Sequence, residues 1–65
     1  MTVFDTIGEV LRQVQRHPGI AMSAIVDLSG LPMEDVDEAA AYLERQGMVT
    51  RTATGRLLLE PKAAP

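Results

Sequence analysis

The feature that most constrains the fold of this chain is the spacing of the glycines that follow its apolar segments. Glycine adopts a left-handed backbone conformation at little cost, so it is common just past the end of a helix and in tight turns. Four glycines lie at such places: Gly19, Gly30, Gly47 and Gly55. This spacing predicts three helices, each followed by a glycine, and then a turn between two strands.

Apolar residues recur three and four residues apart in the predicted helices, as amphipathic helices require. The first helix stops at Pro18, and its predicted core stripe contains Val3, Phe4, Ile7, Val10, Leu11 and Val14. Ile20 is a short extended residue before the second helix, which covers about residues 22–29 around Ile25. Leu31 is expected to return to the core. The third helix covers about residues 33–46, and its predicted core stripe contains Val36, Ala39, Ala40 and Leu43.

After Gly47 the pattern changes from helical to alternating. Residues 48–53 are rich in β-branched side chains, and residues 56–60 form a second run after the turn at Gly55. Successive side chains of a strand point to opposite faces of a sheet. We therefore expect Leu57 and Leu59 to face the helices and Leu58 to face outward, in a strand that ends at Pro61.

The size of the chain restricts what holds this fold together. Of its 65 residues, we expect 1–61 to form one domain and 62–65 to form a disordered C-terminal tail. Without cysteine there is no disulfide, and a single core of this size supplies a margin of roughly 3–5 kcal/mol. Apolar packing must therefore stabilise the domain, and self-association would extend that packing.

Several segments in this order carry a resemblance to a known family. They are Gly19-Ile20, Ile25-Val26, Gly30-Leu31-Pro32, Val36, Leu43-Glu44, Gly47-Met48-Val49 and the run from Thr54 to Leu59. This arrangement resembles the winged helix-turn-helix domains of bacterial transcription regulators, most of all the N-terminal domains of the IclR and MarR groups. The resemblance implies a mainly α fold with a small β-hairpin, an α+β class. It also implies duplex DNA as a partner, with the third helix in the major groove.

The charges of the third helix depart from that pattern. The positions that would meet base edges include Glu34, Asp35, Asp37 and Glu38, and the chain has a formal net charge of −3. Duplex DNA carries one negative charge per ~1.7 Å, which would repel these carboxylates. They can form a solvated helix face, since acids are favourable in the first turns of a helix, or a docking patch for a basic partner.

Two functions remain open from the sequence. In the first, a regulator-type module contacts DNA through the end of the first helix and through the hairpin, or wing, where the candidate residues are Arg51, Thr52, Thr54 and Arg56. In the second, the fold has lost DNA binding and serves as a protein-interaction or dimerisation module. A homodimer or another protein is then the partner, and the candidate apolar interface residues are Met22, Leu28 and Leu58.

Other functions are not expected from this composition. An enzyme would need a nucleophile with a base beside it, and the chain has no cysteine and a single histidine, His17. That histidine alone does not make a metal site, and we expect no cofactor and no small-molecule substrate. No apolar run approaches about 18 residues and no basic segment opens the chain, so we expect a cytoplasmic protein that does not insert into membranes.

Overall fold

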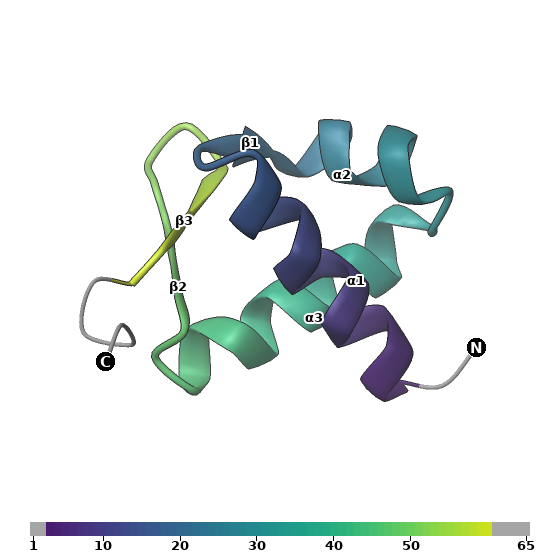
Figure 1. The fold of residues 1–65 in the computed structure, drawn as a ribbon, viewed down its shortest axis with the longest axis horizontal. Coiled ribbons are helices and arrows are strands. Elements are labelled where there is room, and N and C mark those ends of the chain that lie inside the picture. The colour runs from purple at the N-terminus through teal and green to yellow at the C-terminus, as the bar shows by residue number, and fades with distance from the viewer. Residues whose placement is uncertain (1–2, 61–65) are drawn as a thin grey trace.

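A computed structural model describes residues 3–60, which form three helices and three strands (Figure 1). The elements are α1 (Val3–Arg16), β1 (Ile20–Ala21), α2 (Met22–Ser29), α3 (Met33–Arg45), β2 (Val49–Arg51) and β3 (Arg56–Leu59). Three helices followed by a small antiparallel sheet make an α+β domain with a winged helix-turn-helix arrangement, so the predicted fold class is confirmed. The predicted tail, 62–65, lies outside the described residues.

The sheet has three strands rather than the two of the predicted hairpin. β3 is central, in the order β1-β3-β2, and both pairings are antiparallel. Ile20 is in register with Leu57, and the backbone amide of Gly19 donates to the carbonyl of Leu57 at 2.9 Å. The segment between α1 and α2 is therefore a short edge strand, and it joins the helical half of the chain to the wing.

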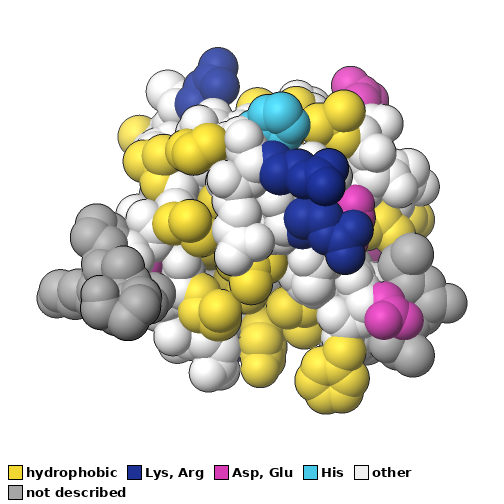
Figure 2. All heavy atoms as spheres, viewed as in Figure 1, with side chains coloured by type: hydrophobic (Ala, Val, Ile, Leu, Met, Phe, Trp, Pro, Cys, Tyr) yellow, Lys and Arg dark blue, Asp and Glu magenta, His cyan; other side chains and the backbone are white. Residues whose placement is uncertain are grey.

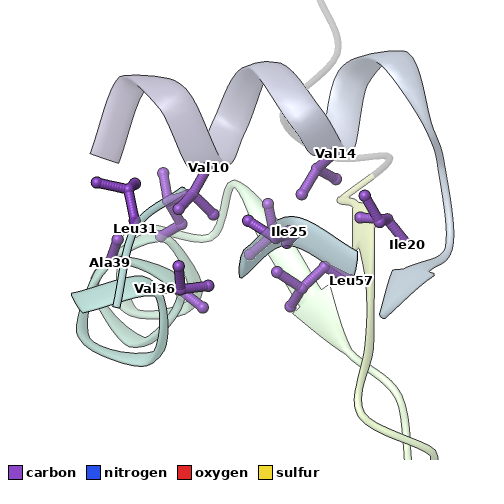
Figure 3. Packing of buried hydrophobic residues seen from close by; sticks show 11 residues of the cluster. Val10, Val14, Ile20, Ile25, Leu31, Val36, Ala39 and Leu57 are labelled. Carbon is purple, nitrogen blue, oxygen red and sulfur yellow. The ribbon is translucent and has the colours of Figure 1, made fainter. Parts of the chain in front are cut away.

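The core lies between α1 on one side and α2, α3 and the sheet on the other. α1 packs chiefly against α3 (Figure 1) and directs Val10 and Val14 toward the buried residues of the other elements (Figure 3). The buried apolar residues are Val10, Val14, Ile20, Ile25, Leu31, Val36, Ala39, Ala40, Leu43, Val49 and Leu57. This set confirms Ile25, Leu31 and the whole predicted stripe of the third helix, but only Val10 and Val14 of the first stripe; Ile7 and Leu11 are half-buried against the core, and the side chain of Val3 lies outside the described part.

Phe4 is an exception, because 80% of its surface is exposed although it was predicted to lie in the core. Val10 is fully buried, and a residue six positions away is about 120° around the helix from it. Phe4 therefore lies beyond the edge of the buried face. On the other side of Val10 the side chain of Gln13 is buried instead, and its amide donates to the Glu9 carboxylate at 3.1 Å.

Leu59 also departs from its predicted position. Leu57 is fully buried, whereas Leu58 is 40% and Leu59 41% exposed, so the outward position of Leu58 is confirmed, while Leu59 shares the face of Leu57 without being buried as Leu57 is. Leu59 pairs with Val49 at the end of β3, beyond the residues that pair with β1. Alternation along a strand buries a side chain only where another element covers that face.

The turn between α2 and α3 follows the glycine prediction. Gly30 has φ +74° and its amide donates to the carbonyl of Val26 at 2.9 Å. The Ser29 hydroxyl donates to the carbonyl of Ile25 at 2.6 Å and accepts from the amide of Leu31 at 3.2 Å. These bonds satisfy backbone groups that the end of α2 leaves unpaired, and they direct Leu31 into the core.

Candidate functional site

The turn of the wing is held by its own threonines. The Thr52 amide donates to the carbonyl of Arg56 at 2.8 Å, and the Gly55 amide donates to the carbonyl of Thr52 at 3.0 Å. The Thr52 hydroxyl accepts from the Arg56 amide at 3.1 Å and lies 3.0 Å from the Thr54 hydroxyl. Both threonines that the sequence offered as phosphate contacts therefore make hydrogen bonds that shape the turn.

Arg51, the first candidate cation of the wing, is paired with α3. Its Nη1 lies 3.1 Å from Oδ1 of Asp37, and its Nη2 lies 2.9 Å from Oε1 of Glu44. Its Nε is buried and has no hydrogen-bond partner within the described part of the chain. The guanidinium thus already faces two carboxylates.

Arg56, the second candidate cation, is directed elsewhere. Its Nη1 donates to the carbonyl of Gly19 at 2.9 Å, which ties the wing to the turn after α1. Arg51 is the cross-strand partner of Leu57 and shares its face of the sheet, whereas Arg56 is adjacent to Leu57 and points to the other face. The structure therefore does not bring the two wing arginines together.

The four predicted patch residues, Glu34, Asp35, Asp37 and Glu38, lie in the first turns of α3 and are all exposed; we refer to them as the acidic face. Asp37 is paired with Arg51. Within residues 3–60, the side chains of Glu34, Asp35 and Glu38 make no ion pair and no hydrogen bond. Three carboxylates on this face therefore remain without a counterion from the described chain.

The cations of α1 lie in its second half. Arg12 pairs with Glu9 at 3.4 Å, while Arg16 and His17 are exposed and make no side-chain ion pair in the described segment. Figure 2 shows arginine side chains gathered beside the histidine over α1. Cations near the end of a helix also complement its dipole, so this grouping has a local structural role.

The apolar interface candidates differ in exposure. Leu28 and Leu58 are exposed, as an interface requires, whereas Met22 is half-buried and packs against the core. The sequence interpretation missed Phe4 and Met33, which are both exposed. Hydrophobic side chains are spread over the face in Figure 2 between the sheet and the N-terminal end of α1.

The ion pairs of Arg51 were also missed, although the sequence holds a signal for them. Residues 27–44 contain six acidic residues and no Lys or Arg, so any counterion must come from another segment. β2 follows α3 after a short turn and packs against that helix. Arg51 is the first cation of that strand, which makes it the natural partner.

Further observations restrict the kind of site. Within residues 3–60 no group of three His, Cys, Asp or Glu side chains is placed to hold a metal ion. No helix of this segment is long and apolar enough to cross a membrane. No protein-family model matches the chain, and no curated protein matches it either. The likeness to the IclR and MarR groups thus stays a prediction, and the fold supports only the winged-helix layout.

Proposed function

We propose that this chain is a protein-interaction module with a winged-helix fold, and that the acidic face of α3 docks a basic surface of a partner protein. The observation that carries the proposal is the charge around α3. The wing cation that contacts this helix, Arg51, forms ion pairs with Asp37 and Glu44. Glu34, Asp35 and Glu38 remain exposed and unpaired by any described side chain.

Electrostatics favour a cationic partner over DNA for this face. An approaching phosphate backbone would meet three uncompensated carboxylates, and the nearest guanidinium already has two carboxylate partners. A basic protein surface would instead gain complementary charges, which accelerate association and select the partner. DNA contact through the wing stays a prediction, and the same experiment tests it.

The test is an NMR titration of the labelled chain with a lysine-rich peptide and, separately, with random duplex DNA at low salt. With the peptide we expect amide shifts concentrated on residues 34–38, which salt abolishes because exposed charges are screened. Shifts spread over all acidic residues would contradict a defined site. Shifts confined to residues 51–56 on adding DNA would instead support the DNA function.

Single-charge variants give this test a matched control. Glu38→Gln removes a carboxylate from the acidic face, and Asp27→Asn removes an exposed carboxylate from α2. We expect Glu38→Gln to weaken peptide binding about threefold, as for one exposed charge pair, and Asp27→Asn to leave it nearly unchanged. Equal effects of the two variants would mean that peptide affinity depends only on the net charge of the chain and not on the acidic face.

Self-association is a second candidate function, and the exposure of Phe4 favours it. The Phe4 ring is 80% exposed, so an interface that covers it would remove a large apolar surface from water. We expect concentration-dependent dimers in sedimentation experiments, and we expect Phe4→Ser to weaken them about tenfold. Gln15→Ser, at an exposed polar position of the same helix, is the control and should leave the dimers unchanged. A chain that stays monomeric at high concentration would contradict this function.

A further inference from the structure

Arg51 has an arrangement that no other cation of residues 3–60 shares, because two carboxylates face it. Asp37 and Glu44 are seven residues apart on α3, which is close to two full turns, so they lie on the same side of the helix. Each carboxylate holds a different terminal nitrogen of the guanidinium, at 3.1 Å and 2.9 Å. The three residues form what we call the Arg51 clamp.

The clamp occupies the two terminal nitrogens of Arg51, which a phosphate would also bind. A guanidinium binds a phosphate with two parallel N–H donors, which gives that contact its strength and its geometry. In the clamp both terminal nitrogens already face carboxylate oxygens, and the third nitrogen, Nε, is buried. The cluster carries a net charge of −1, so a phosphate would have to displace a carboxylate while being repelled by it.

We propose that Asp37 and Glu44 are an autoinhibitory contact, which prevents Arg51 from binding the phosphates of a nucleic-acid duplex. The clamp, and not the absence of a cation, then sets the affinity of the wing for DNA. This inference concerns a different ligand from the basic partner of the proposed function and stands independently of it. Releasing Arg51 creates a duplex-binding wing on an otherwise unchanged fold.

The test compares two double variants that change the net charge equally. Asp37→Asn with Glu44→Gln opens the clamp, and Glu34→Gln with Asp35→Asn removes two carboxylates that do not contact Arg51; each pair of changes takes the formal net charge from −3 to −1. Binding of a fluorescent random duplex is measured by anisotropy at low salt. We expect the clamp variant to bind about tenfold more tightly than the control variant, as one strong charged contact predicts.

A third variant assigns the gain to the guanidinium. Adding Arg51→Gln to the clamp variant should abolish the gain. The inference is overturned by a gain that survives this change, by an equal gain in the control variant, or by no gain at all. Circular dichroism checks the fold, and Asp37→Asn or Glu44→Gln alone provides the same comparison with only one ion pair broken.

Discussion

Replacing Leu57 by alanine is expected to unfold most of the chain. Leu57 is fully buried at the centre of the sheet, between Ile20 of β1 and Arg51 of β2. Truncating a buried leucine to alanine costs about 2–5 kcal/mol, through lost transfer free energy and the cavity left behind. A single core of this size supplies a margin of only about 3–5 kcal/mol, so the loss removes most of the stability.

Leu58→Ala is the matched control, because it makes the same chemical change one residue further along the strand. Leu58 is 40% exposed, so its truncation removes fewer contacts and leaves no closed cavity. Urea unfolding followed by circular dichroism should give a much lower midpoint for Leu57→Ala and nearly the original midpoint for Leu58→Ala. Similar midpoints for the two variants would show that the sheet does not face the helices as described.

The helix periodicities predicted the core well where the buried face continues along a helix. Val10, Val14, Val36 and Leu43 are buried as their spacing indicates. Phe4 and Gln13 show the limit of such reasoning. An amphipathic pattern fixes the direction of the apolar stripe around the helix only approximately. The buried face of α1 is rotated away from the predicted stripe, so Phe4 is exposed and Gln13 is buried. Only the contacts with α3 and the sheet determine that rotation.

Long-range pairings account for the other differences. β1 has two residues, which is too short for any alternation to be recognised, and it becomes a strand only through its pairing with β3 far along the chain. The candidate site depends on similar contacts. Arg51 and Asp37 are fourteen residues apart in sequence. Composition indicated an acidic third helix that needs a counterion from another segment, but only the contact of β2 with α3 identifies Arg51 as the partner of Asp37 and Glu44.

Gly47→Ala and Gly8→Ala are expected to change stability in opposite directions, although the chemical change is the same. A Cβ at either position would meet no atom within 4 Å, so packing does not distinguish them. Gly8 lies within α1, where alanine is favoured over glycine by roughly 0.5–1 kcal/mol. Gly47 has φ +73°, a conformation that costs a residue with a Cβ about 1–2 kcal/mol.

Hydrogen bonds at the end of α3 hold Gly47 in that conformation. Its amide donates to the carbonyl of Glu44 at 3.0 Å, and the amide of Met48 donates to the carbonyl of Leu43 at 3.0 Å, a pairing typical of helices that end in glycine. β2 begins two residues later, so relaxing the strain would also displace Arg51 from its partners on α3. Thermal unfolding should show a lower midpoint for Gly47→Ala and a higher one for Gly8→Ala, by about 4–8 °C per kcal/mol in a domain of this size. A shift of the same sign in both variants would contradict the left-handed end of α3, and with it the path by which the wing returns to this helix.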